Sequence, residues 1–319
     1  MNKKEFIIKY PNKNFQTRLD KKGVFIFDAS SLLKIYSFTS TERKKFIKAI
    51  ARLSKENRLW SPYQFFEEFE RHRAQILQEE FDAYTKFKNI FDQNLNIQLE
   101  DNKIKEFNNH SVLKVFIKKY LQEIKKYYAI KLKDLSSLKK KHLLSDYDSV
   151  KVQLWNCYNN KIGDEYSFDR HQEICKEGEG RYKKFIPPGY TDVGKSQNDF
   201  TKQKQYGDLV AWYQIKDFAK KYKKPIIMIT DDKKEDWWNI NKKIRCGARI
   251  ELVYELFCYA GVDLKMMTFE DFLQYAEQKL NLKVTDAELT EYEERDQNIL
   301  VTPLLEQSSV EKETSNNFN

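Results

Sequence analysis

The chain has 319 residues, of which 40% are hydrophobic and 14% aromatic, enough for a substantial core. This composition predicts one α/β domain that carries insertions. No stretch approaches the roughly 20 uninterrupted apolar residues of a membrane-spanning helix, and the N-terminus lacks the apolar run of a signal peptide. We therefore expect no membrane association and a cytoplasmic location.

Charge is unevenly spread along the chain. The net charge is +9, but residues 284–319 contain nine acids and two bases, which makes this tail −7 and leaves +16 on residues 1–283. A basic body favours a polyanionic partner and salt-sensitive association. A lysine-rich, solvated surface explains the same composition equally well. The acidic tail is predicted to be largely disordered.

Cysteines and histidines show no ligand pattern. The four cysteines lack C-x-x-C spacing and matched histidines, so we expect buried free thiols and neither a zinc site nor disulfides. The four histidines have no spacing typical of a ligand set, and none is assigned a catalytic role. These residues are Cys157, Cys175, Cys246, Cys258, His72, His110, His142 and His171.

The first part of the chain alternates strand and helix signals. Residues 1–22 are expected to form a polar lead-in. Residues 24–27 are continuously apolar, which predicts a buried strand that ends at Asp28. A helix should follow it, and another should open near Thr39. The sequence from Ser61 to Gln64 then predicts a helix start with a capping box, which places Glu67 and Glu68 in the second turn.

Residues from about 80 to 145 form a long stretch without proline or glycine. Its helical periodicity predicts a helical arm inserted into the α/β core. Lysines occupy much of its polar face and could follow a phosphate backbone, although an ordinary solvated helix face is the favoured interpretation for any single lysine.

The second half begins with a stretch, residues 176–205, that is expected to be loop-like, because Gly178 and Gly180 loosen the chain before Arg181. It contains a rigid turn at Pro187-Pro188-Gly189, followed by Asp192 and Lys195, which could face a neighbouring pocket or simply lie on a surface loop. Asp208 falls in the first turn of the next helix.

Two more strands are predicted after this helix. The apolar run of residues 225–230 predicts a strand that leads into Asp231 and Asp232, and residues 262–267 predict another. A closing helix is expected from Phe269 to Leu280.

Carboxylates therefore follow two strands and two helix starts. The carboxyl ends of parallel strands meet at one edge of a sheet, so these acids can converge on one crevice. Mg²⁺ and Mn²⁺ prefer such hard oxygen ligands. With two ions about 4 Å apart, one would activate a water and the other would stabilise the departing oxygen of a phosphodiester. The pattern indicates a metal-dependent nuclease.

The order of these motifs resembles the PIN-like nuclease domains, in the branch that carries a helical insertion. The resemblance covers roughly residues 23–280. It implies a three-layer α/β fold in which a parallel sheet is flanked by helices. The motifs are Phe25-Ile26-Phe27-Asp28, Pro62-Tyr63-Gln64 with Glu68-Phe69 and Arg71-x-Arg73, Arg181 ahead of Ile186-Pro187-Pro188-Gly189-Tyr190-x-Asp192, Gly207-Asp208-Leu209 with Trp212, and Thr230-Asp231-Asp232-Lys233-Lys234-Glu235-Asp236-Trp237-Trp238.

The resemblance also implies the roles of individual acids. The catalytic and metal-binding set would be Asp28, Glu68 in preference to Glu67, Asp208, and Asp232 with Asp231 as a close competitor. One departure is that the family usually has Thr or Ser and then Asn after its first acid, where this chain has Ala29 and Ser30. The missing hydroxyl could weaken metal binding or activity. Secondary candidates for the site are Ser30, Asp192 and Asp236.

Basic and aromatic residues complete the hypothesis. Arg73, Lys195 and Lys233 are predicted to hold phosphate, whereas Arg71 is expected to pair with Glu67 or Glu68 on its own helix. Trp237 and Trp238 could stack on unpaired bases, but packing is the favoured role for at least one.

The leading hypothesis is a metal-dependent endonuclease that acts on RNA or single-stranded nucleic acid, in a toxin-like or phage-defence setting as in many similar proteins. The runner-up is a catalytically silent nucleic-acid-binding or protein-assembly module. In either case the helical arm or the acidic tail could recruit a protein partner. The predicted organisation is a lead-in over 1–22, a PIN-like domain over 23–283 and an acidic tail over 284–319.

Overall fold

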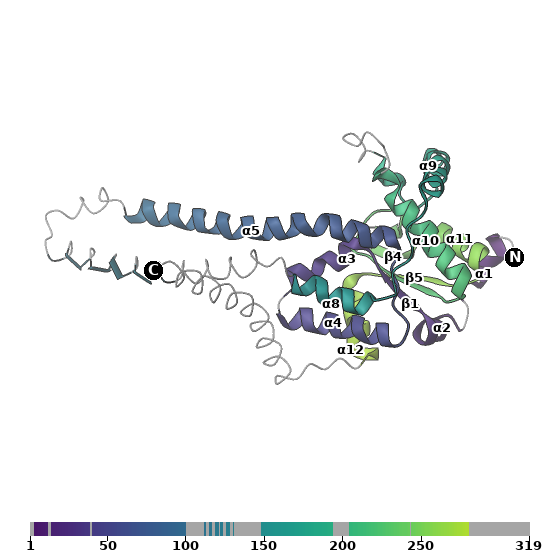
Figure 1. Cartoon of the computed structure of the whole chain (residues 1–319), viewed down its shortest axis with the longest axis horizontal. Coiled ribbons are helices and arrows are strands. Elements are labelled where there is room, and N and C mark those ends of the chain that lie inside the picture. The colour runs from purple at the N-terminus through teal and green to yellow at the C-terminus, as the bar shows by residue number, and fades with distance from the viewer. Residues whose placement is uncertain are drawn as a thin grey trace, which may run out of the picture. The chain divides into compact units, whose positions relative to one another are not determined.

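The computed structural model (Figure 1) describes residues 3–11, 14–38, 40–99, 148–193, 204–242 and 244–280, with scattered positions between 112 and 130. Its elements, in chain order, are α1 (Lys3–Lys9), α2 (Phe15–Lys22), β1 (Val24–Phe27), α3 (Ala29–Leu33), η1 (Lys34–Ser37), α4 (Ser40–Lys55), α5 (Tyr63–Leu99), α8 (Ser149–Tyr158), α9 (Phe168–Lys183), η2 (Tyr190–Asp192), η3 (Lys204–Tyr206), α10 (Gly207–Tyr222), β2 (Ile226–Ile229), β3 (Trp238–Asn241), β4 (Ile244–Ala248), α11 (Ile250–Ala260), β5 (Leu264–Met267) and α12 (Phe269–Lys279).

A parallel sheet in the order β1-β2-β5 forms the centre of the fold. All four residues of β1 pair in register with β2, and β2 pairs in the same way with β5. The strands β1 and β2 are short apolar runs with every side chain buried, and β5 is apolar and buried except at Lys265, as expected for a sheet covered on both faces. The predicted fold class is confirmed. The hairpin of β3 and β4 forms a separate antiparallel pair.

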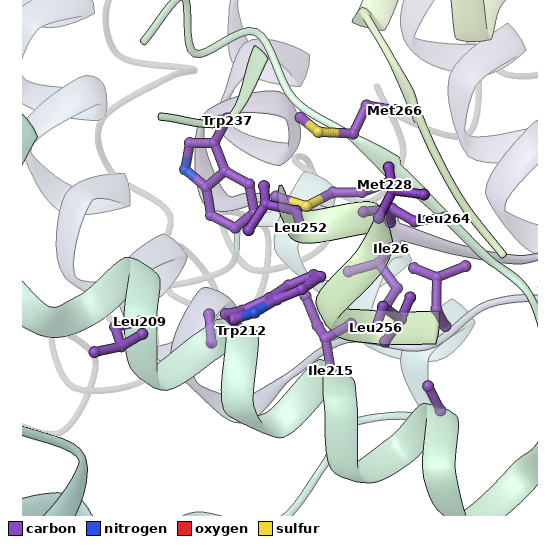
Figure 2. Close-up of a cluster of buried hydrophobic side chains, with 14 of the residues drawn as sticks. Ile26, Leu209, Trp212, Ile215, Met228, Trp237, Leu252, Leu256, Leu264 and Met266 are labelled. Atoms are coloured by element: carbon purple, nitrogen blue, oxygen red, sulfur yellow. The ribbon is translucent and has the colours of Figure 1, made fainter. Parts of the chain in front are cut away.

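Alternate side chains of the strands supply two apolar layers. Ile26 and Met228 belong to the core cluster on one face, where they pack with residues of α10 and α11 such as Trp212 and Leu256 (Figure 2). On the other face, the Phe27 ring packs edge-on against Phe46 of α4 and Phe272 of α12, with centroids 5.6 Å and 4.8 Å away. The three layers follow from the two-residue period of a strand.

The segment predicted as a polar lead-in contains α1 and α2, both of which pack on the core. Phe6 is buried against the rings of Tyr254 and Phe257, and Leu19 is fully buried. The Tyr10 hydroxyl donates to the Leu264 carbonyl at 2.7 Å. Few apolar residues mark this segment; Phe6 and Leu19 face inward, whereas Ile7 is exposed.

The start of α5 differs from the predicted capping box. The Ser61 hydroxyl donates to the Pro62 carbonyl, and the Gln64 N–H donates instead to the side chain of Gln214 on α10 at 3.0 Å. A long-range amide thus replaces the local cap and ties the start of α5 to α10. No local sequence pattern signals such a cap.

Helix α9 overturns part of the predicted loop over 176–205, because residues 176–183 are helical. The side chain of Ser167 caps this helix by accepting from the Arg170 N–H at 3.3 Å. Gly178 suggested a break, yet it lies within the helix where a Cβ would come within 2.6 Å of the Tyr206 ring. The glycine allows the Tyr206 ring to approach the helix backbone closely, and the sequence alone does not reveal this contact.

Two compact units divide the described residues: those within Met1–His72 and Ser149–Glu293, and those within Arg73–Asp148. Helix α5 continues to Leu99, so the first part of the predicted arm extends the helix that begins at Tyr63. Most of the arm beyond Leu99 and the whole acidic tail lie outside the described residues. None of the described helices is long and apolar enough to cross a membrane.

The four cysteines are free, as predicted, but only Cys157 and Cys175 are buried. Cys246 and Cys258 are exposed, which corrects the expectation of buried thiols for that pair.

Gly178 and Gly180 offer a matched test of the close contact in α9. The variant Gly178→Ala should lower the free energy of unfolding by about 1–3 kcal/mol, because the methyl group would press on Tyr206 and Leu209. The control Gly180→Ala should raise it by about 0.5–1 kcal/mol, since that site is exposed with no atom near the added Cβ. Urea unfolding followed by circular dichroism measures both, and equal effects would contradict the packing role.

Candidate active site

Asp28 and Asp232 lie at the carboxyl edge of the sheet, just after the paired strands β1 and β2. The parallel register places Phe27 beside Ile229, and the Asp28 N–H donates to the Ile229 carbonyl at 3.0 Å. One hydroxyl joins the two acids, because Thr230 Oγ1 donates to Asp28 Oδ2 and accepts from the Asp232 N–H. The sheet therefore fixes the spacing of both acids.

Three neighbours hold the Asp28 carboxylate in place. The Ser31 N–H donates to Oδ1 at 2.7 Å, so Asp28 also caps α3, and the Ser30 hydroxyl lies 2.9–3.0 Å from both oxygens. Burial raises the pKa of Asp28, and these hydrogen bonds, with that of Thr230, counteract part of the rise. The hydroxyls of Ser30 and Thr230 thus support the carboxylate where Ala29 supplies none.

A cavity of about 710 Å³ opens at this edge of the sheet. It brings together six carboxylates from five parts of the chain: Asp28 after β1, Glu67 and Glu68 in the second turn of α5, Asp192 in η2, Asp208 in the first turn of α10, and Asp232 after β2. Its lining is Asp28, Ala29, Ser30, Gln64, Phe65, Glu67, Glu68, Arg71, His72, His171, Asp192, Gly207, Asp208, Met228, Asp232, Lys234 and Trp237.

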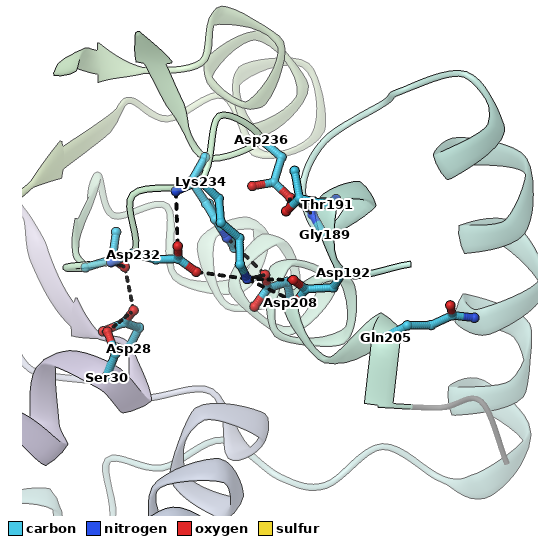
Figure 3. A network of polar contacts seen from close by, with 12 residues as sticks. Asp28, Ser30, Gly189, Thr191, Asp192, Gln205, Asp208, Asp232, Lys234 and Asp236 are labelled. Atoms are coloured by element: carbon cyan, nitrogen blue, oxygen red, sulfur yellow. Dashed lines mark hydrogen bonds and ion pairs between the residues drawn. The ribbon is translucent and has the colours of Figure 1, made fainter. Parts of the chain in front are cut away.

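The Lys234 ammonium lies among three of these acids (Figure 3). Its Nζ is 2.9 Å from Asp192 Oδ1, 3.2 Å from Asp208 Oδ2 and 2.9 Å from Asp232 Oδ2. The side chain is only 21% exposed, so water screens these contacts less than it would at the surface. The Lys234 N–H also donates to Asp232 Oδ1 at 3.0 Å, which folds the loop back on its own acid.

These contacts shift the pKa values of the pair that they join. Burial raises the pKa of Asp208 to about 6; the Lys234 ammonium opposes that rise, and the carboxylates of Asp192 and Asp236 add to it. Burial by itself lowers the pKa of Lys234, but the surrounding carboxylates outweigh burial and raise it overall. One ammonium shared among several carboxylates keeps its proton firmly and only partly offsets the repulsion between them.

Both indoles of the Trp237-Trp238 pair are buried and donate toward the acids. Trp237 Nε1 donates to Asp208 Oδ2 at 3.2 Å, and Trp238 Nε1 donates to the Asp232 carbonyl at 2.7 Å. The Trp237 ring also meets Trp212 edge-on, with centroids 6.2 Å apart. The packing role expected for at least one indole holds for both, which removes them as surfaces on which bases could stack.

The proline turn positions Asp192 through a buried carboxylate. Asp236 Oδ2 accepts from the Gly189 N–H and from the Thr191 hydroxyl, each at 2.8 Å. Gly189 has φ +93°, a conformation that favours glycine, and its position also lies close to Tyr182. Asp236 therefore acts on the cavity indirectly, by fixing the turn that carries Asp192.

The donor set suits a hard divalent cation. The cavity offers several carboxylate oxygens and no cysteine, together with His72 and His171, and carboxylate oxygens are the donors that Mg²⁺ and Mn²⁺ prefer. Among the residues that the structure describes, no three acidic, histidine or cysteine side chains form a preassembled ligand cluster, and Lys234 separates the acids that it bridges.

Comparison with known proteins assigns this chain to a family. Residues 24–252 match the family described as PIN like domain. The chain belongs to the PIN-like domain family. Membership indicates a nuclease-type function, with nucleic-acid binding and the divalent metal use that is typical of such domains. Searches among curated proteins and among solved structures found no match.

Several predicted residues lie apart from the cavity of this PIN-like domain. Asp231 Oδ2 accepts from Lys34 Nζ at 2.6 Å, and its Oδ1 accepts from the Phe269 N–H at the start of α12. Lys233 is exposed and absent from the cavity lining. Arg73 pairs with Asp148 at 2.8 Å within the second unit. Lys195 lies outside the described residues.

The cavity also contains residues that sequence reasoning missed. Lys234, rather than its neighbour Lys233, enters the acid cluster. Arg71 lines the cavity and is exposed, and in the described part of the chain it makes no ion pair with Glu67 or Glu68. His72 and His171 also line it, and His72 Nε2 lies 3.9 Å from Glu68 Oε1. Only the four-residue spacing of His72 from Glu68 could have signalled this placement.

Asp236 and Glu235 provide a matched test of the turn. The variant Asp236→Ala should lower the free energy of unfolding by about 1–3 kcal/mol, because the Gly189 N–H would be buried without an acceptor. The control Glu235→Ala removes an exposed carboxylate that, within the described part of the chain, accepts a hydrogen bond from the Tyr190 hydroxyl alone, and it should cost less than about 1 kcal/mol. Urea unfolding compares the two variants, and an equal loss would refute the special role of Asp236.

Proposed function

We propose that this PIN-like domain is a metal-dependent endonuclease that hydrolyses phosphodiesters of RNA or single-stranded DNA. The observation that carries the proposal is the convergence of six carboxylates on one cavity at the carboxyl edge of a parallel sheet. The family supports the general nuclease assignment. The cavity supports the specific chemistry, since its oxygen donors suit Mg²⁺ or Mn²⁺.

Four acids are proposed to hold the ion or ions: Asp28, Glu68, Asp208 and Asp232. Asp231 is a weaker candidate, because its carboxylate is engaged by Lys34 and by the start of α12. A bound divalent ion would supply charge stabilisation and activation of the attacking water. The chain's own residues keep the acids in position: Thr230 links Asp28 to Asp232, and Trp238 holds the backbone beside Asp232.

Cationic side chains near the acids are proposed to bind the substrate's phosphates. Arg71 is the best placed, because it lines the cavity on the same helix face as Glu68 and its guanidinium can form paired hydrogen bonds with phosphate. Lys233 is exposed next to Asp232 in sequence, and phosphate contacts by Lys233 and Lys195 remain predictions. The charge of +16 on residues 1–283 would add a salt-sensitive contribution to binding.

The variant Asp28→Asn tests the proposal, because the amide keeps the size of the side chain and removes the charge. The parent chain should cleave labelled single-stranded RNA or DNA in Mn²⁺ or Mg²⁺ and should be silent in EDTA. Asp28→Asn should lose at least about 100-fold in rate while keeping the parental circular dichroism spectrum. The substrate that is cleaved would identify RNA or DNA as the target.

The matched control is Asp231→Asn, which makes the same change outside the cavity. It should retain the parental rate within about tenfold, because Asp231 contacts Lys34 and α12 rather than the cavity. A loss as large as that of Asp28→Asn would place Asp231 among the metal ligands. Tight nucleic-acid binding without any metal-dependent cleavage would favour a silent binding or assembly module.

Arg71 and Arg73 separate substrate binding from structural pairing. The variant Arg71→Met should raise KM about tenfold with little change in kcat, because a phosphate contact is made equally before and during reaction. Arg73→Met should change KM by less than about threefold, since Asp148 already engages its guanidinium. Steady-state cleavage kinetics at fixed salt measure both. A larger effect at Arg73 would restore the assignment predicted from sequence.

A further inference from the structure

Lys234 pairs with three acids of the cavity, and the proposed function assigns this lysine no role. Its ammonium contacts carboxylates from three different elements: Asp192 in η2, Asp208 in α10, and Asp232 in the loop after β2. Figure 3 shows the side chain pointing into this group of acids. Lys233, the adjacent residue and also a lysine, is exposed.

The ammonium and a divalent cation require the same donors. Lys234 Nζ is a compact positive charge with three hydrogen-bond donors, and it lies 2.9–3.2 Å from oxygens that a metal would need. Two of its three partners, Asp208 and Asp232, belong to the proposed metal-binding set. A carboxylate oxygen directed at an ammonium cannot coordinate a metal in the same direction, and the two cations would repel each other.

The lysine side chain is able to give up this position. It sits on four flexible carbons. The loop is held by the Lys234 N–H, which donates to Asp232 Oδ1, and by Trp238 Nε1, which donates to the Asp232 carbonyl, and neither hydrogen bond involves Nζ. Other charged groups face the same cavity: Asp28, Glu68, Glu67 and Arg71. An ammonium displaced from Asp208 and Asp232 therefore remains near acidic partners such as Asp192.

We propose that Lys234 is an internal cation that occupies the metal-binding carboxylates and competes with the divalent ion for them. This inference rests on the proposed function, because it concerns the same acids. It implies that Lys234 weakens metal binding while it stabilises the metal-free cavity. A residue that only cross-linked the acids in their binding positions would have the opposite effect, since its removal would weaken metal binding.

Mn²⁺ binding to the full chain without nucleic acid tests the competition, by calorimetry and by the electron paramagnetic resonance of free Mn²⁺. Lys234→Met and Lys234→Gln should bind Mn²⁺ at least about tenfold more tightly than the parent, because the competing charge is gone. Lys234→Arg keeps the charge and should remain close to the parent. Lys233→Met removes one exposed positive charge at the adjacent position and should change the affinity by less than about threefold.

Thermal unfolding supplies a second readout that does not depend on activity. Without metal, Lys234→Met should melt below the parent because three carboxylates lose their shared counter-charge. Saturating Mn²⁺ should raise its melting temperature by more than it raises that of the parent. Failure of both neutral variants to fold even in saturating Mn²⁺ would overturn the proposal, since a metal ion would then be unable to replace the ammonium.

The outcomes separate this inference from the function on which it rests. Equal or weaker Mn²⁺ affinity in Lys234→Met and Lys234→Gln, with clear binding by the parent, would refute the competition and leave the metal-dependent nuclease intact. Absence of Mn²⁺ binding from the parent and from both neutral variants would refute the metal site itself, and the competition with it.

Discussion

The ion pairs of Lys234 with Asp192, Asp208 and Asp232 are the interaction on which the arrangement of acids in the cavity depends. Carboxylates gathered in a half-buried space repel one another, and low exposure limits the screening that water would provide. Burial raises the pKa of Asp208, and the carboxylates of Asp192 and Asp236 add to the rise, although the ammonium opposes it. Because the three acids come from separate elements, one cation holds together parts of the chain that the sheet does not connect.

Around this charge cluster, neutral hydrogen-bond donors hold the acids in position. The hydroxyls of Ser30 and Thr230 fix Asp28, the Trp237 indole donates to Asp208, and the Trp238 indole fixes the backbone at Asp232. Neutral donors lower the cost of burying a carboxylate without adding a charge that would repel an incoming cation. They can therefore remain in place whether an ion is bound or absent, unlike an ammonium.

Sequence reasoning located the acids because their signals are local. Asp28 and Asp232 come at the ends of buried apolar runs, and Asp208 falls in the first turn of a helix. The parallel pairing of β1 with β2 then places Asp28 and Asp232 at the same edge of the sheet. It failed where tertiary contact decides the outcome. Gly178 has the pattern of a helix break, but the Tyr206 ring requires a glycine within α9. The cap that Gln214 gives to α5 spans 150 residues and leaves no local trace.

Which of Lys233 and Lys234 enters the acid cluster is likewise decided by tertiary structure and not by a local sequence pattern. Both lysines lie in one run of mixed charge, a pattern typical of a solvated loop, and the sequence prediction assigns phosphate binding to Lys233 and no role to Lys234. The loop conformation separates them, because the Asp232 carboxylate accepts the Lys234 N–H and turns that side chain inward. Asp232 thus selects its own counter-ion. Asp232 is proposed to bind metal, and Lys234 is proposed to compete with that metal. Because the Lys234 N–H donates to the Asp232 carboxylate, a movement of the loop that displaces Lys234 also alters the position of Asp232.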